Sequence, residues 1–224
     1  MSHDTKGPVS TSEFEVDPQD LQHHSHLRTI RLVDGARVGL TLLALLSGIT
    51  ILGTSGHALD VYNNTSLATN FLLPLWPDEF DARPTVALVI GSAIVVLASI
   101  LSLAFSKTAS LRSRVAIHTP LTLVTPFVGF TASTIAMILF YAVNTSSTVD
   151  TLQSWSCQWE SIEMTVQPYF GTLCRESKTA LYLSVILVPV EAVILSLAGY
   201  QLALEKKAAG LARSTKRGSP TPSA

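Results

Sequence analysis

Four apolar stretches dominate this chain and constrain its fold more than any other feature. They cover about 38–56, 84–105, 121–143 and 180–204. An α-helix rises about 1.5 Å per residue and the hydrocarbon core of a bilayer is about 30 Å thick, so about 20 residues span it. Only 14% of the 224 residues are charged, against about 25% in an ordinary soluble domain. We therefore predict an all-α, polytopic membrane protein built as a four-transmembrane-helix bundle.

Polar segments divide the rest of the chain. We predict a disordered cytoplasmic N-terminal tail over 1–27, because this segment is polar and poor in large apolar residues. A four-span membrane domain follows over 28–207, with outer loops at 57–83 and 144–179. The basic segment that ends it leads into a second disordered cytoplasmic tail over 208–224.

The basic residues predict the orientation of the spans. All but three of the 15 lysines and arginines flank the spans on one side, and the exceptions are Arg83, Arg175 and Lys178. By the positive-inside rule both termini are cytoplasmic. The N-glycosylation sequons, at Asn63, Asn64 and Asn144, all fall in the two predicted outer loops. We therefore expect a multi-pass protein of the plasma membrane or secretory pathway that carries glycans at these asparagines.

The second outer loop contains both cysteines of the chain, Cys157 and Cys174. In an oxidising lumen such a pair is expected to form a disulfide, worth about 3 kcal/mol in the chain-entropy model. Trp155 and Trp159 flank the first cysteine, and Trp76 lies in the other outer loop. These indoles fit either an aromatic belt at the membrane interface or a surface that binds a partner, and both interpretations stay open.

Glu191 lies near the middle of the fourth apolar stretch. A carboxylate is costly at that depth, so it is a functional-site hypothesis by default. Hydroxyls lie near the midpoints of the other spans, at Ser47, Ser92, Thr131, Ser133 and Thr134. We expect a protonated Glu191 that donates a hydrogen bond to one of these serine or threonine hydroxyls. Two roles remain open: a buried acid that specifies helix packing, or a proton or cation relay.

The layout resembles that of MARVEL-type tetraspan proteins: four spans, cytoplasmic termini and a cysteine pair in the second outer loop. The chain more specifically resembles a family of four-span integral membrane proteins of filamentous ascomycetes, over nearly the whole of 28–207. The segments that carry it are Phe-Leu-Leu-Pro-Leu-Trp-Pro at 71–77, Ala-Arg-Pro-Thr at 82–85, Trp-Ser-Cys-Gln-Trp at 155–159 and Phe-Gly-Thr-Leu-Cys at 170–174. The resemblance implies location and architecture. MARVEL proteins are associated with membrane apposition, vesicle traffic and membrane subdomains, which is an analogy at the level of fold.

Sequence motifs of common enzymes are missing. The chain has no Walker loop, no His-Glu-x-x-His, no Gly-x-Ser-x-Gly and no paired metal-ligand pattern. We therefore expect a non-enzymatic membrane organiser without cofactor, metal or nucleic-acid partner. Its partners would be the lipid bilayer and other membrane proteins or a second copy of itself. The alternative is a proton-linked transporter or channel subunit that uses Glu191.

Overall fold

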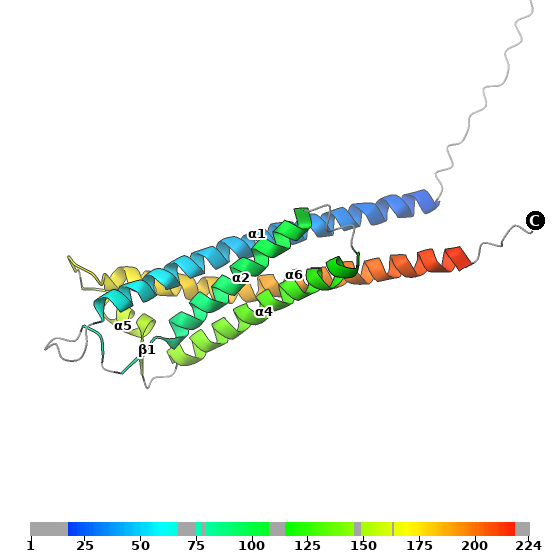
Figure 1. Ribbon diagram of the computed structural model, residues 1–224. Helices are drawn as coiled ribbons and strands as arrows, with labels where there is room; N and C mark the ends of the chain where they lie inside the picture. Colours follow the sequence, from blue (N-terminus) through cyan, green and yellow to red (C-terminus); the bar gives the residue numbers. More distant parts are fainter. Residues whose placement is uncertain are drawn as a thin grey trace, which may run out of the picture.

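The computed structural model describes residues 18–66, 75–77, 79–107, 115–145, 149–162 and 164–217. Its described part is mostly helical, and four long helices pack side by side in Figure 1. These are α1 (Pro18–Thr65), α2 (Arg83–Lys107), α4 (Val115–Thr145) and α6 (Phe170–Arg217). The first residues of α1 and the last of α6 lie at the same end of the bundle (Figure 1). The predicted bundle of four long helices is therefore confirmed.

All four long helices are apolar enough and long enough to cross a membrane, over Leu32–Thr65, Arg83–Ser106, Leu123–Thr145 and Phe170–Leu204. Large apolar side chains point away from the bundle on several helices. Leu97 is 62% exposed, Phe127 57% and Ile186 53%. Soluble monomers rarely expose apolar surface of this extent, whereas lipid tails cover it at no cost. The described helices are those of a multi-pass integral membrane protein.

The two outermost helices extend well beyond the predicted spans. With 48 residues each, α1 and α6 are about 72 Å long, more than twice the hydrocarbon thickness. The start of α1 at Pro18 and the end of α6 at Arg217 correct the predicted tails, and Thr65 and Phe170 lie within the predicted outer loops. Hydropathy marks only the lipid-covered part of a helix. Gln, Glu, Lys and Arg are good helix formers, so the helices continue past it.

The bundle is held by close approach of backbones around a mostly aliphatic core. This core comprises Ala44, Ile51, Leu88, Val95, Ala136, Phe140, Ala180, Leu187 and Ile194. The tightest crossing joins α2 to α4 at Gly91, where an added Cβ would lie 2.5 Å from the Cβ of Ala136. At Gly48 of α1 it would lie 3.0 Å from Val96 of α2. Helices in lipid usually associate through small residues at their contacts. Lipid tails are as apolar as the helix surfaces, so the hydrophobic effect does not drive the helices together.

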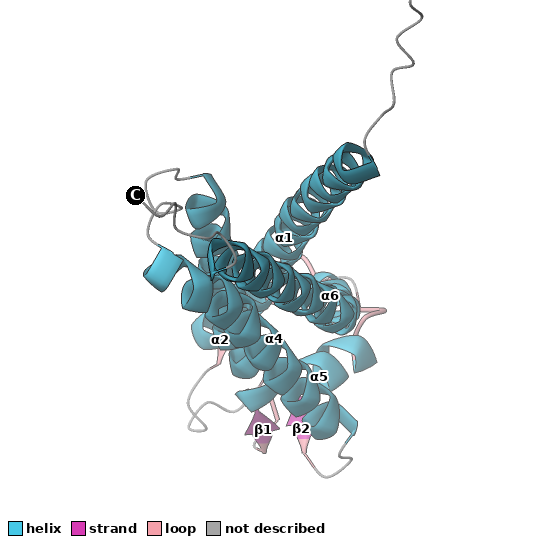
Figure 2. Ribbon diagram, turned by 90° about the vertical axis from the view of Figure 1, so that its right-hand side faces the viewer, coloured by secondary structure: helices cyan, strands magenta, loops and turns pink. Residues whose placement is uncertain are grey.

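The end of the bundle opposite the termini has a second packed cluster with its own buried core, which we call the head. It comprises residues 58–66, 75–77, 79–82, 149–162 and 164–174. Here β1 (Phe80–Asp81) pairs in parallel with β2 (Asp150–Thr151), so the two predicted outer loops meet. Figure 2 shows the two strands side by side next to α5 (Leu152–Gln158). The all-α prediction did not include this strand pair.

Candidate functional sites

The head is built around Trp76, of which only 6% of the surface is exposed. Its ring meets those of Tyr62, Phe80 and Phe170 edge-on, with centroids 5.1, 5.3 and 5.6 Å away. Its indole Nε1–H donates to Thr65 Oγ1 over 3.0 Å. Trp76 therefore joins α1, β1 and α6 inside a core. This burial leaves little of the ring exposed for a partner contact, while its predicted place at the membrane interface or over the end of the bundle stays a prediction.

Thr151 fixes the start of α5. Its Oγ1 accepts a hydrogen bond from the backbone N–H of Ser154 over 3.2 Å, and Ser154 Oγ accepts one from the Thr151 N–H over 2.9 Å. This reciprocal pair is a capping box, which satisfies two backbone donors of the helix terminus. The Thr151 hydroxyl also donates to Asn144 Oδ1 at the end of α4. Since Thr151 belongs to β2, one residue connects α4, the strand pair and α5.

The three predicted glycosylation sites differ in access. Asn63 and Asn64 are exposed near the end of α1. The carboxamide nitrogen of Asn144 is buried and has no hydrogen-bond partner among the described residues. A glycan attaches to this nitrogen. In the folded chain the nitrogen of Asn144 that would carry a glycan is therefore not accessible. Glycosylation of Asn63 and Asn64 stays a prediction.

The head contains the two cysteines at bonding distance. Cys157 of α5 and Cys174 of α6 form a disulfide with Cα atoms 4.8 Å apart. The Lys178 ammonium lies 3.3 Å from the Glu160 carboxylate and bridges the same two segments. The chain between the cysteines is thus a closed loop held against the first turns of α6.

This closed loop displays large side chains that the head does not bury. Trp159 is 37% exposed and Val166 71%, with Ile162 and Tyr169 about half exposed. We call these four residues the ridge. Trp155 is only half-buried and lies against Trp159, with ring centroids 5.7 Å apart. Of the three predicted tryptophans, Trp159 is the accessible one. Ile162, Val166 and Tyr169 are not predicted from the sequence, because no periodic pattern distinguishes them within an irregular loop.

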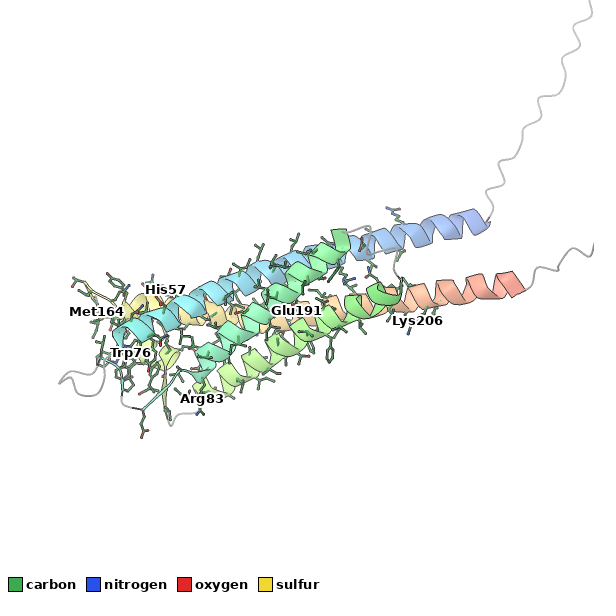
Figure 3. The ribbon with its side chains drawn as sticks, viewed as in Figure 1. His57, Trp76, Arg83, Met164, Glu191 and Lys206 are labelled. Atoms are coloured by element: carbon green, nitrogen blue, oxygen red, sulfur yellow. A yellow bond between two sulfur atoms is a disulfide. The ribbon has the colours of Figure 1, made fainter. Side chains whose placement is uncertain are left out.

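Glu191 lies in the other candidate site, within the membrane-spanning part of the bundle, at the position labelled in Figure 3. It is 3% exposed and lines a cavity of about 10 Å³, measured as the room for the centre of a water molecule. All four long helices line this cavity. The residues are Thr41 of α1; Ala98, Ser99 and Ser102 of α2; Thr125 and Pro126 of α4; and Glu191 and Ile194 of α6.

The absence of a side chain at Gly129 makes room for the Glu191 carboxyl. A Cβ at Gly129 would lie 2.9 Å from Oε2 and 3.2 Å from Cδ of Glu191. No residue in the described part of the chain forms a hydrogen bond with this carboxyl group. The predicted hydrogen bond from Glu191 to a serine or threonine is therefore not formed. The carboxyl group instead lies against Gly129, next to the cavity that Glu191 lines.

The hydroxyls near Glu191 are not those predicted. Ser92, Thr131, Ser133 and Thr134 donate to carbonyl groups of their own helices one turn earlier, and Ser47 does not line the cavity. Such bonding to the preceding turn is common for serine and threonine inside helices. The prediction placed each span's midpoint at the same depth. In the structure Glu191 instead shares its level with Thr41, Ser99, Ser102 and Thr125, nearer the termini.

A side-chain contact between polar groups connects α1 and α6 next to the head. His57 Nδ1 lies 2.9 Å from Glu176 Oε2. In the part of the chain that the structure describes, no three His, Cys, Asp or Glu side chains are grouped so as to hold a metal ion.

Comparison of the chain with protein families, with curated proteins and with solved structures finds no match.

Removal of the disulfide tests how far the closed loop depends on it. For the double variant Cys157→Ser, Cys174→Ser we expect the head to lose about 3 kcal/mol, because a crosslink across this separation restricts the unfolded chain by about that amount. Protease cleavage between residues 159 and 169 should become faster. The same change should follow reduction of the unaltered protein. Equal cleavage rates before and after reduction would contradict the expectation.

Proposed function

We propose that this protein is a non-enzymatic organiser of its membrane, and that the head makes its specific contacts with another membrane protein. One observation carries this proposal: the ridge is displayed on a loop that is covalently closed and packed onto the bundle. Trp and Tyr are enriched among the residues that dominate binding energy at protein interfaces. A loop that is already ordered loses little further conformational entropy when a partner binds.

The height of the head favours a protein partner over lipid tails. Gly48 of α1 lies against Val95 of α2. Measured from these residues toward the head, α1 extends for about 26 Å to Thr65, whereas α2 extends for only about 18 Å to its first residue, Arg83. The Arg83 side chain is 92% exposed, as expected of a residue at the edge of the hydrocarbon. In Figure 3, Met164 of the closed loop that carries the ridge lies further from the termini than Arg83 does. Lipid tails that cover α2 therefore do not reach the ridge.

The orientation of the bundle supports the same proposal. The basic residues predict that the termini are cytoplasmic, which places the head on the outer or lumenal side, where a disulfide persists. The resemblance to MARVEL-type proteins gives a matching role, organisation of membrane subdomains or traffic, by analogy of fold. Contacts between the outer head and a neighbouring protein would supply the specificity.

Substitution of the ridge tests the proposal. We expect Ile162→Ser combined with Val166→Ser to reduce photo-crosslinking from a probe at position 169 to a discrete partner by about tenfold or more, since two exposed apolar side chains that a partner covers contribute about 1 kcal/mol each. The tagged protein should also lose any patchy distribution in its membrane. Thr172→Ala is the matched control, because Thr172 is exposed on the same head outside the ridge.

The double variant should keep its disulfide and its amount in the membrane, because both substituted side chains are exposed. Crosslinking and distribution that remain the same as in the unaltered protein would overturn the proposed role of the ridge.

A further inference from the structure

We propose that the cavity beside Glu191 binds one small monovalent cation, a proton or a sodium ion, which exchanges with the side of the membrane on which the termini lie. This goes beyond the proposed role of the head and does not depend on it. The starting observation is that Glu191 is 3% exposed, has no hydrogen-bond partner among the described residues and lines a cavity.

The groups around the cavity suit a hard cation. They are the Glu191 carboxyl and four hydroxyls, contributed by Thr41, Ser99, Ser102 and Thr125. Oxygen ligands of this kind are those that hard cations prefer. The Thr41 hydroxyl donates its proton to the Arg37 carbonyl over 2.8 Å. Its oxygen lone pairs therefore remain available for a cation or for a water molecule that carries a proton.

Charge balance requires a single positive charge. A carboxylate away from water is very costly unless a positive charge compensates it. Among the residues that the structure describes, no lysine, arginine or histidine lines the cavity. Arg37 lies one turn from Thr41, but its guanidinium donates to Gln201 Oε1 over 2.9 Å, and Gln201 is about 15 Å along α6 from Glu191. A monovalent cation neutralises the site, whereas a divalent ion would leave an excess charge.

The room beside the lining residues matches a small occupant. A volume of about 10 Å³ for the centre of a water molecule corresponds to roughly one bound water. The pocket is partly open and not fully enclosed, so this volume describes the room beside its lining residues. The occupant is therefore either one bare ion or one water molecule next to a protonated carboxyl group.

The depth of the cavity determines the side from which a cation enters. On α2, Ser102 lies about 7.5 Å from Lys107, the last helical residue, whereas Ser99 lies about 24 Å from Arg83 at the opposite end. The route to the end with the termini is thus the shorter one by far. Exchange with that side requires a cation to pass only about two turns of helix.

Labelling by dicyclohexylcarbodiimide tests this proposal on the purified full-length protein. This apolar reagent adds to a protonated carboxylic acid, and peptide mass spectrometry locates the adduct. We expect labelling of Glu191 that falls as the pH is raised, by about tenfold per pH unit once the site is mostly deprotonated. If sodium is the occupant, NaCl should protect Glu191 and choline chloride should not. A proton site gives the pH dependence without protection by sodium.

Two results would overturn the proposal. Labelling that is independent of both pH and sodium would show a permanently protonated structural acid, and absence of labelling under every condition would show a site closed to exchange. Both readouts use the unaltered protein, so they hold even if Glu191→Gln, which serves as the blank, fails to fold.

Gly129→Ala supplies a second, geometric test. A methyl group there would lie 2.9 Å from Oε2 of Glu191 and displace the carboxyl group from its position. We expect labelling to change at least severalfold and its pH dependence to shift. Gly199→Ala is the matched control on α6, because nothing lies within 4 Å of an added Cβ there. Identical labelling profiles for the two variants would contradict the assigned position of the carboxyl group.

Discussion

Replacement of Trp76 by alanine is expected to destabilise the head by about 3–5 kcal/mol, the usual cost of removing a large aromatic side chain from a core. Trp76 contacts three other aromatic rings and donates a hydrogen bond to Thr65. Its loss leaves a cavity at the point where α1, β1 and α6 meet. The bundle core around Val95 is a separate cluster and should remain folded.

Trp159→Ala is the control for this prediction. Trp159 is 37% exposed and belongs to the same head, so its removal should cost about 1 kcal/mol or less. Limited proteolysis and thermal unfolding of the two purified variants measure the difference. Similar losses for both would mean that Trp76 does not hold the head together. Because the ridge is mounted on this core, Trp76→Ala should also weaken the partner contact, although Trp76 itself is buried.

Gly91→Ala is expected to destabilise the bundle by about 1–3 kcal/mol through overpacking. The added Cβ would lie 2.5 Å from the Cβ of Ala136 and 3.2 Å from the carbonyl oxygen of Ala132. Both neighbours belong to the rigid part of α4, so neither can rotate away as the end of a long side chain would. Relief requires α2 and α4 to move apart, which loses contacts along the whole crossing.

Gly199→Ala should instead stabilise the bundle. With nothing within 4 Å of the new methyl group, the substitution retains only the higher helix propensity of alanine, about 1 kcal/mol. Unfolding of both variants in mixed micelles of increasing denaturing detergent provides the comparison. Ala136→Gly should restore part of the stability lost in Gly91→Ala, because it removes the closest contact. An equal effect of the two alanine substitutions would exclude a tight α2–α4 crossing.

The two candidate sites occupy different levels of the molecule. The ridge lies in the head, beyond the outer end of α2, and the Glu191 cavity lies toward the termini. Variants of one site should therefore leave the other intact, since distant sites without shared contacts contribute additively. Ridge variants with unchanged labelling of Glu191 would show that partner contact and cation binding are separate properties.

Local composition by itself determined the spans, because about 20 apolar residues are needed wherever a helix crosses lipid, whatever its neighbours. It also identified Glu191 as an unusual residue and the cysteines as a candidate pair. Tertiary structure alone decided that Trp76 is a core residue, that the two predicted outer loops pair as β1 and β2, and that Thr41, Ser99, Ser102 and Thr125 share a cavity with Glu191. Those outcomes depend on how far each helix is shifted along its neighbours. That shift is set by close contacts such as Gly91 with Ala136, between residues remote in sequence, and no local pattern encodes it.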